Sequence, residues 1–251
     1  MGSDPNASAN STPNTRLVRW RSATRVVATR FPPINLYERV SADPEVWDAL
    51  IAAEQMVNPQ VRDAIGDLRL VALEEQVSGP GSAALMAPFT HWNPMGSRFS
   101  DGSYGVYYAG DGVATAVAET AYHFARIARQ SADGPRYETM SVQEGPINAS
   151  MHDLDRTDAA TRAALLDPDS YVASRQFGQL LRPTSASLQT ARGNGIYYPS
   201  IRRAGGHCIA VFRPSMLRIP GQGRYLGFDW DGERVRRYFD YYDRVWVTIR
   251  E

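Results

Sequence analysis

The sequence contains no lysine and only one cysteine among its 251 residues. The single cysteine excludes an intramolecular disulfide, and its place in the apolar run Cys208–Phe212 predicts a buried strand residue rather than a nucleophile. The cysteine and histidine spacings of zinc sites are missing, and the four histidines form no cluster, so we expect no metal site. No run of about 18 consecutive apolar residues occurs, so we expect no membrane span.

The chain also lacks an excess of charge of either sign. Its 27 basic side chains, all arginine, balance 27 acidic ones, so the formal net charge is zero. This balance argues against direct binding to nucleic acid or to an anionic membrane. The apolar fraction of 43% is sufficient for a sizeable core. The N-terminus has no apolar signal core, so a reducing cytoplasm is the expected location.

A polar N-terminal segment precedes one large domain. Residues 1–15 are small and polar, and we expect them to be disordered, whereas residues 16–251 form the domain. Arg16–Thr29 reads as a short strand or arm, and Ile34–Val40 as a strand. Residues 41–80 read as a helical hairpin inserted between this strand and the next motif. Its apolar residues recur at helical spacing: Val46, Trp47, Leu50 and Ile51 in the first helix, and Val61, Ile65, Leu68 and Leu73 in the second.

Helical and strand patterns alternate over the rest of the chain. A helix is predicted over 112–130, with an apolar stripe of Val113, Val117, Thr120, Phe124 and Ile127. Two shorter helices are predicted near 158–166 and 170–181. Strands are predicted at 105–109, 137–142, 147–154, 195–200, 207–212 and 244–249.

The segment from Arg98 to Glu119 is the most informative of the chain. Arg98 precedes a glycine-spaced turn, Tyr108 closes an apolar strand, and Glu119 follows eleven residues later on the 112–130 helix. The planar fork of an arginine suits a pyrophosphate, a tyrosine ring offers a flat face to a nicotinamide or adenine, and a carboxylate stabilises positive charge on a ribose. Together these residues suggest an enzyme that binds a dinucleotide and breaks its glycosidic bond.

Three further residues complete the candidate site. His123 lies one turn after Glu119, and both sit beside the apolar stripe, where they can face a cleft. Ser200 follows Gly195–Pro199, and its hydroxyl is placed to bind Glu119 or a ribose. Arg39 ends the 34–40 strand. Three of the candidate residues have a plainer alternative: a surface ion pair for Arg39, an ordinary turn for Ser200, and half-buried core for Tyr108.

One glycine pattern is set aside. Gly221, Gly223 and Gly227 are spaced differently from the dinucleotide fingerprint, and they neither follow a predicted strand nor open a helix. We therefore do not expect a Rossmann site.

These residues resemble those of the RES domain, a family named for its Arg, Glu and Ser. The resemblance rests on Arg39 in Leu-Tyr-Glu-Arg-Val, on Arg98 ten residues before Tyr108, on Glu119, and on Ser200 in Tyr-Tyr-Pro-Ser-Ile-Arg. It covers roughly residues 34 to 215. The family comprises bacterial toxins of Xre–RES toxin–antitoxin pairs.

The resemblance implies an α+β fold similar to ADP-ribosyltransferases, with a split, mixed β core and flanking helices around an NAD cleft. It implies cleavage of NAD⁺ as substrate, with phosphate or water as acceptor, and an Xre-family antitoxin as partner. By matched position, Arg39 and Arg98 would contact the dinucleotide and Tyr108 would line the nicotinamide pocket. Glu119 would be the catalytic acid, and Ser200 would complete the site; beside them His123 is a candidate substrate contact.

The chain departs from the family pattern in three ways. The 41–80 hairpin separates the two arginines, Arg98-Phe99-Ser100 replaces the usual Arg-Trp-Asn, and the N-terminal arm and the tail after about Arg218 are extra. The hairpin is expected to protect a core edge, form a homodimer surface or meet the antitoxin. Two other functions stay open: a protein mono-ADP-ribosyltransferase that uses the same site, and a non-catalytic domain that binds a nucleotide or partner.

Overall fold

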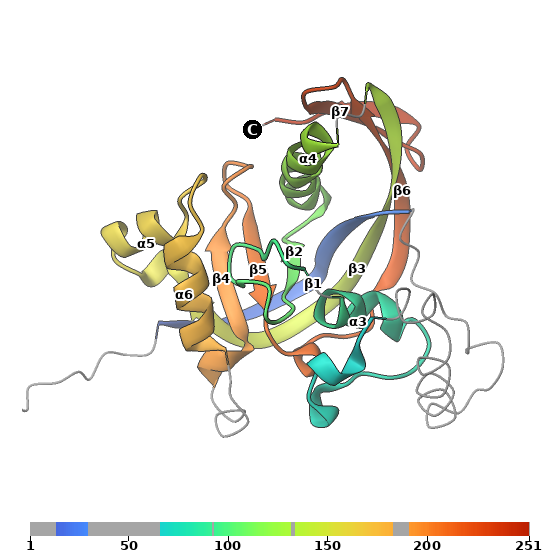
Figure 1. The fold of residues 1–251 in the computed structure, drawn as a ribbon. Helices are drawn as coiled ribbons and strands as arrows, with labels where there is room; N and C mark the ends of the chain where they lie inside the picture. Colours follow the sequence, from blue (N-terminus) through green and yellow to red (C-terminus); the bar gives the residue numbers. More distant parts are fainter. Residues whose placement is uncertain (1–13, 30–65, 92, 132–133, 183–190, 251) are drawn as a thin grey trace, which may run out of the picture.

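A computed structural model describes residues 14–29, 66–91, 93–131, 134–182 and 191–250. These residues form a mixed eight-stranded sheet in the order β1-β2-β5-β4-β3-β6-β7-β8, flanked by four described helices (Figure 1). The predicted α+β class with a mixed β core is therefore confirmed. Within the described residues, no helix is both long and apolar enough to cross a membrane.

The elements have the following bounds. The strands are β1 Thr15–Ala28, β2 Tyr107–Gly110, β3 Arg136–Asp153, β4 Gly195–Pro199, β5 His207–Val211, β6 Gly221–Trp230, β7 Val235–Asp240 and β8 Val245–Thr248. The helices are α3 Ser82–Thr90, α4 Val113–Gln130, α5 Ala159–Leu165 and α6 Val172–Leu181, and two short 3-10 helices cover Leu68–Leu70 and Leu73–Glu75.

The long strand β3 organises the sheet. Along one edge it pairs with β1, from Thr15 opposite His152 to Ala28 opposite Met140. Its other edge pairs first with β6 and then, at its end, in parallel with β4. β3 has neighbours on both edges at residues 140–144 and again at its end, which satisfies its backbone there, and along much of the strand buried side chains alternate with exposed ones.

Strand pairing connects five strands, β1, β2, β5, β4 and β3, into a closed ring. One of the pairings in this ring is very short. The pairs β2–β5, β5–β4 and β3–β1 each contain several residue pairs, whereas β1 and β2 meet at a single pair, Thr24 opposite Gly110. The two strands therefore diverge on either side of this pair. This opening in the sheet positions the candidate site described below.

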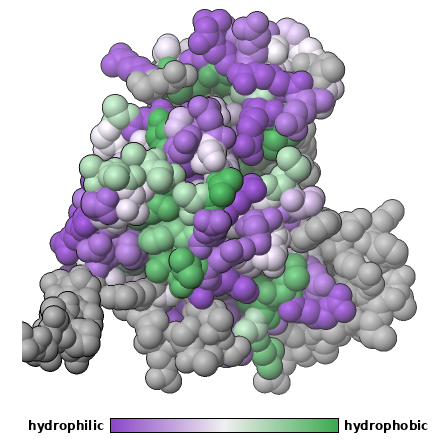
Figure 2. All heavy atoms as spheres, turned by 60° about the vertical axis from the view of Figure 1, so that its left-hand side comes forward, coloured by the Kyte–Doolittle hydropathy of each residue, from purple (hydrophilic) through white to green (hydrophobic). Residues whose placement is uncertain are grey.

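Helices cover the sheet in separate places. In Figure 1, α4 lies inside the curve formed by β3, β6 and β7, whereas α5 and α6 lie beside β4. Figure 2 shows the latter side, where apolar side chains gather in the middle of the face among mostly hydrophilic ones. Three buried clusters fill the interior, under α3, under α4, and between α6 and the β4–β5 pair.

The apolar face of α4 differs in part from the predicted stripe. Val117 and Phe124 are buried as expected, but Ile127 is 59% exposed. The buried face is instead completed by small residues, Ala116, Ala121, Ala125 and Ala128. Alanines allow the helix backbone to approach the sheet closely, so the buried face is rotated relative to the one expected from the larger side chains.

The 41–80 segment differs from the predicted hairpin where it can be compared. Residues 1–13 and 30–65, and with them most of the predicted disordered segment, the 34–40 strand, Arg39 and most of the hairpin, lie outside the described residues. Thr15, at the end of the segment predicted to be disordered, is instead the first residue of β1. The predicted continuation of the second helix through Leu68 to Leu73 is wrong. Gly66 adopts a left-handed conformation with φ 81°, and Leu68 and Leu73 lie in separate 3-10 turns.

Other elements were predicted with mixed success. The strand in 16–29, the 112–130 helix, the two shorter helices and the strands at 105–109, 195–200, 207–212 and 244–249 are confirmed within a few residues. The strands predicted at 137–142 and 147–154 are one continuous strand, β3. Helix α3 and strands β6 and β7 were not predicted, and Gly221 begins β6 rather than a phosphate-binding turn.

A buried carboxylate joins the N-terminal strand to the end of β3. The side chain of Asp153 is fully buried, and its carboxylate accepts hydrogen bonds from Arg16 Nε at 2.8 Å and the backbone N of Asp155 at 3.0 Å. Arg156 Nε lies 3.2 Å from the same carboxylate. Two guanidinium groups therefore depend on one buried negative charge.

We predict that Asp153→Asn lowers the free energy of unfolding by about 2–4 kcal/mol, because both arginines lose their buried counter-charge. Urea denaturation measures the change. Asp169→Asn, at an exposed aspartate, is the matched control and should stay within about 0.5 kcal/mol of the parent. Equal stability of the two variants would contradict the structural role of Asp153.

Candidate active site

A cavity of about 310 Å³ opens where β1 and β2 diverge. Its walls come from β1, the loop before β2, β2 itself, α4, and the β4–β5 pair. The lining residues are Thr24, Arg25, Val26, Asn93, Gly96, Ser97, Arg98, Tyr108, Ala109, Gly110, Ala116, Glu119, Thr120, His123, Arg126, Ile127, Tyr198 and Cys208. Four of the six candidate residues, Arg98, Tyr108, Glu119 and His123, thus line one cavity.

Glu119 is oriented by the turn between β4 and β5. Ser200 Oγ donates a hydrogen bond to Glu119 Oε1 at 2.6 Å, and the backbone N of Ile201 donates to the same oxygen at 3.1 Å. The expected Ser200–Glu119 contact is therefore present. No described residue donates to Oε2, which leaves one oxygen of this half-buried carboxylate for a ligand in the cavity.

The sequence of this turn explains why Ser200 is well placed. The Ser200 hydroxyl accepts hydrogen bonds from the backbone N of Arg202 at 3.2 Å and of Arg203 at 3.1 Å, a local serine turn. With both acceptor positions used by the turn, the hydroxyl proton points to Glu119. A Cβ on Gly206 would lie 2.6 Å from Thr115 Oγ1 on α4, so only glycine allows the turn to pack this closely against the helix.

Arg98 is buried and held by backbone carbonyls. Its NH1 group donates to the carbonyl oxygens of Leu165 at 3.3 Å and Asp167 at 2.8 Å, and its guanidinium lies 4.4 Å from the ring centre of Tyr171. Carbonyls and a ring fix a cation without neutralising it. Among the described residues Arg98 therefore has no acidic partner, and it presents a cation at the cavity wall.

Tyr108 positions the Arg98 loop with its hydroxyl. The hydroxyl oxygen accepts a hydrogen bond from the backbone N of Phe99 at 3.0 Å and lies 2.8 Å from Ser97 Oγ. Burial of the side chain raises the pKa of Tyr108 to about 12, so the hydroxyl stays protonated. Tyr108 lines the cavity while its hydroxyl faces the loop, which makes it a wall of the site and a support for Arg98.

His123 is neutral at neutral pH. Burial is the main cause that lowers its pKa to about 4, and the positive charges of Arg126, Arg202 and Arg98 act in the same direction. The carboxylate of Glu119 raises the pKa of His123, but this effect is smaller than the lowering by burial. A neutral imidazole can accept one hydrogen bond and donate another to a ligand.

Two cavity residues were missed by the sequence reasoning, and one predicted residue cannot be compared. Arg25 on β1 is half-buried, lies 5.3 Å from the ring centre of Tyr107, and forms no ion pair with any described residue. An arginine inside a strand leaves no pattern that distinguishes it from a surface arginine. Arg126 follows Glu119 by seven residues, so helical spacing alone was sufficient to place both on one face. Arg39 lies outside the described residues.

The lining carries an excess of positive charge. Arg25, Arg98 and Arg126 face one acid, Glu119, and His123 is neutral, so the described lining has a formal charge of +2. An arginine-lined cavity with one carboxylate favours a ligand with two negative charges. Cys208 is buried, and burial raises the pKa of its thiol well above the usual value, so it stays protonated and supplies no nucleophile, as predicted.

Residues 75–231 match a family model described as the RES domain. The chain belongs to this family. Arg98, Tyr108, Glu119 and Ser200 fall inside the matched segment. Arg39 precedes it, although the resemblance had been expected from about residue 34. The match also continues past Arg218 to the end of β6, so the expectation that the tail after Arg218 lies entirely outside the family is wrong.

Two individual proteins are similar to this RES-domain chain. One is a Sinorhizobium fredii protein described as uncharacterized protein y4oC, with 27% identity over 220 residues that cover 87% of each chain. The other is a chain of the M. tuberculosis MbcT–MbcA toxin–antitoxin complex, with 13% identity, a TM-score of 0.35, and coverage of 54% of this chain and 73% of that one. The second similarity is too distant to support an argument.

The lowered pKa of His123 predicts a pH-dependent stability. An unfolded histidine protonates near pH 6.5 but the folded one only near 4, so stability is fully present above 6.5 and is lost as the pH falls toward 4. Glutamine cannot titrate. Between pH 7.5 and pH 5 we therefore expect the free energy of unfolding of His123→Gln to fall by about 1–2 kcal/mol less than that of the parent. Urea denaturation at both pH values measures this difference.

His91→Gln is the matched control, because His91 is an exposed histidine outside the cavity. It should show the same pH dependence as the parent protein. If His123→Gln did so as well, His123 would titrate normally in the folded state.

Proposed function

We propose that this RES-domain protein cleaves the bond between nicotinamide and ribose in NAD⁺ and acts as the toxin of a bacterial toxin–antitoxin pair. The observation that carries the proposal is the orientation of Glu119. Ser200 and Ile201 bind one carboxylate oxygen, and the other is open toward a cavity that also holds Arg98, Tyr108 and His123.

The charges of the cavity suit this substrate. A pyrophosphate carries two negative charges, which equals the formal excess of positive charge on the described lining. Arg98 and Arg25 are the groups for this contact, because each guanidinium lacks an ion pair to a described residue. A volume of about 310 Å³ lies at the lower end for small-ligand pockets, so we expect the adenosine end of the dinucleotide to lie outside the cavity.

In the proposed reaction, the bond between the ribose anomeric carbon and the nicotinamide nitrogen breaks, and its electron pair leaves with nicotinamide. Positive charge develops on the ribose ring. The free oxygen of Glu119 accepts a hydrogen bond from a ribose hydroxyl, and its negative charge stabilises the oxocarbenium-like transition state. Phosphate or water then attacks the anomeric carbon, giving ADP-ribose-1″-phosphate or ADP-ribose.

Ser200 acts as a positioning residue in this scheme. Its hydroxyl proton is hydrogen-bonded to Glu119, the carboxylate that the scheme assigns to the ribose, and no second described base is hydrogen-bonded to Ser200 Oγ. Its contribution is to hold Glu119 in one rotamer. This arrangement supports cleavage by charge stabilisation rather than through a covalent serine intermediate.

The biological part of the proposal follows from the family. RES-domain toxins act with Xre-family antitoxins, so we propose that such a protein occludes the cavity and that cleavage of NAD⁺ takes place in the cytoplasm. The proposal does not require a homodimer.

We predict that the purified protein releases nicotinamide from NAD⁺ and that Glu119→Gln lowers turnover by about 10²–10³ while binding of NAD⁺ changes little. Chromatographic assay of nicotinamide gives the rate, and calorimetry gives the affinity. Glu74→Gln, at an exposed glutamate outside the cavity, is the matched control and should behave as the parent.

Product analysis with and without phosphate decides the acceptor. Transfer of ADP-ribose to a protein in place of both small products would favour the mono-ADP-ribosyltransferase alternative. Absence of nicotinamide release at high enzyme concentration, with phosphate present, would overturn the enzymatic assignment. Growth arrest of a bacterial host by the parent but not by Glu119→Gln tests the toxin assignment.

For Ser200→Ala we expect turnover to fall by about tenfold or more with the Michaelis constant for NAD⁺ nearly unchanged, because Glu119 loses one charge-assisted hydrogen bond but keeps that of Ile201. Ser200→Thr, which retains the hydroxyl, should recover part of the rate. Steady-state kinetics of the two variants provides the comparison. Complete loss in Ser200→Ala with no recovery by threonine would instead indicate that the turn itself had collapsed.

A further inference from the structure

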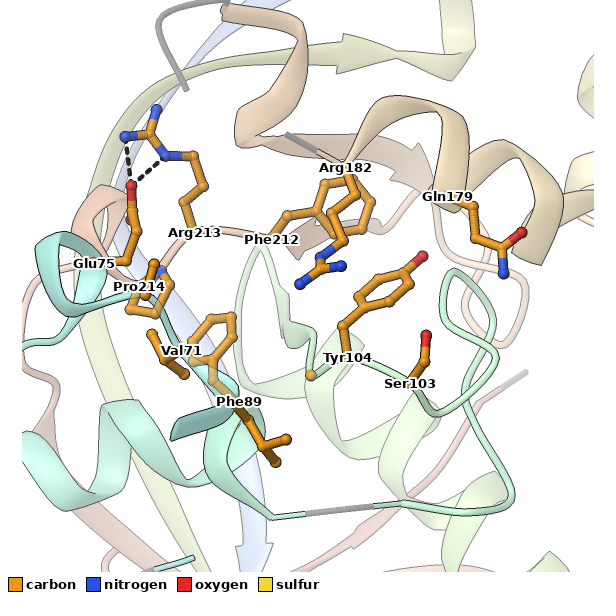
Figure 3. A pocket seen from close by; sticks show the side chains of 13 residues that line it. Val71, Glu75, Phe89, Ser103, Tyr104, Gln179, Arg182, Phe212, Arg213 and Pro214 are labelled. Atoms are coloured by element: carbon orange, nitrogen blue, oxygen red, sulfur yellow. Dashed lines mark hydrogen bonds and ion pairs between the residues drawn. The ribbon is translucent and has the colours of Figure 1, made fainter. Parts of the chain in front are cut away.

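A second cavity, of about 430 Å³, lies beside the loop that follows Arg98, and it shares no described lining residue with the first (Figure 3). Its walls come from the 70–75 segment, α3, the loop before β2, the end of α6, and the segment after β5. The lining residues are Leu70, Val71, Ala72, Glu75, Phe89, Ser103, Tyr104, Gly105, Gln179, Arg182, Phe212, Arg213 and Pro214.

The only acid in this described lining is already neutralised. The Glu75 carboxylate accepts a hydrogen bond from Arg213 Nε at 2.8 Å, and Arg213 NH2 lies 2.6 Å from the same oxygen. The hydroxyl of Ser215 donates to the other oxygen. Figure 3 shows this ion pair at one side of the cavity, with both charges directed at each other.

Arg182 differs from Arg213 in having no acidic partner among the described residues. Its guanidinium lies 4.6 Å from the ring centre of Tyr104 and points into the cavity (Figure 3). A ring face holds a cation in place but does not neutralise its charge. The lining of the second cavity therefore offers one unbalanced positive charge to a ligand.

Rings and apolar side chains form the other walls. Val71, Phe89, Tyr104 and Phe212 are all buried at less than 10% exposure, and Tyr104 and Phe212 meet edge to face with ring centres 6.1 Å apart. In Figure 3, Phe89 and Val71 lie across the cavity from Arg182. Such walls favour a flat apolar body, because aromatic groups pack well in offset or edge-to-face contact.

We propose that this cavity binds a small aromatic monocarboxylate, with the carboxylate on Arg182 and the ring between Tyr104 and Phe89. One unbalanced cation matches one negative charge. A dianion such as phosphate is disfavoured, because one unbalanced cation matches only half of its charge and much of the wall is apolar. The proposal is independent of NAD⁺ cleavage, since neither Glu119 nor Ser200 lines this cavity.

The test is calorimetric titration of the full-length protein with benzoate, phenylacetate and indole-3-acetate. At least one should bind in the micromolar to millimolar range. The corresponding amides, which keep the ring but lose the charge, should bind about tenfold more weakly or worse. Inorganic phosphate should not compete.

Substitutions in the lining test whether the ligand binds in this cavity. Arg182→Gln should weaken binding by about tenfold or more, and Ala72→Trp, at an exposed lining position, should block the cavity with bulk. Arg234→Gln, at an exposed arginine of the β6–β7 turn, is the control and should bind as the parent. Circular dichroism confirms that each variant is folded.

Three results would overturn the proposal. They are absence of binding by all three acids at millimolar concentration, equal binding of acids and amides, and unchanged affinity in both folded variants, Arg182→Gln and Ala72→Trp. Loss of NAD⁺ cleavage by the protein would leave these measurements unaffected.

Discussion

The single residue pair between β1 and β2 is the constraint on which the site depends. β3 binds β1 along most of its length, so β1 does not need β2 as a neighbour to satisfy its backbone. The two strands can therefore diverge at Thr24 and Gly110 without loss of the fold. α4 lies across the opening, and its glutamate reaches the cavity because small alanines on the opposite face bring the helix close to the sheet.

The absence of lysine is reflected in how the cations are held. Arg98 lies over Tyr171 at 4.4 Å, Arg202 over Tyr122 at 3.4 Å, and Arg182 over Tyr104 at 4.6 Å. A planar guanidinium can stack on a ring and still donate hydrogen bonds at its edge, whereas an ammonium group cannot do so in the same way. Rings thus orient these cations without cancelling their charge, and both cavities keep a positive wall.

The sequence predicted those site residues whose positions follow from the strand or helix in which they lie. Tyr108 lies in the short strand β2 and Glu119 belongs to the next helix, so their relation follows from periodicity, and Ser200 follows from an apolar strand that ends in a turn. Arg25 was missed because its role depends on how far β1 lies from β2, which no local pattern records. Helix α3 was missed because Pro88 lies inside it, and β6 because its glycines weaken the strand pattern.

The loop from Ser97 to Gly105 connects the two cavities, and its rigidity follows from contacts on every side. Tyr104 donates its hydroxyl proton to the carbonyl of Phe99 at 2.7 Å, and Tyr108 accepts from the backbone N of the same residue. A Cβ on Gly178 of α6 would lie 2.2 Å from the Phe99 carbonyl, so helix and loop are in direct backbone contact. A loop fixed from both faces holds Arg98 at the first cavity before any ligand arrives, which is the arrangement that electrostatic stabilisation of a transition state requires.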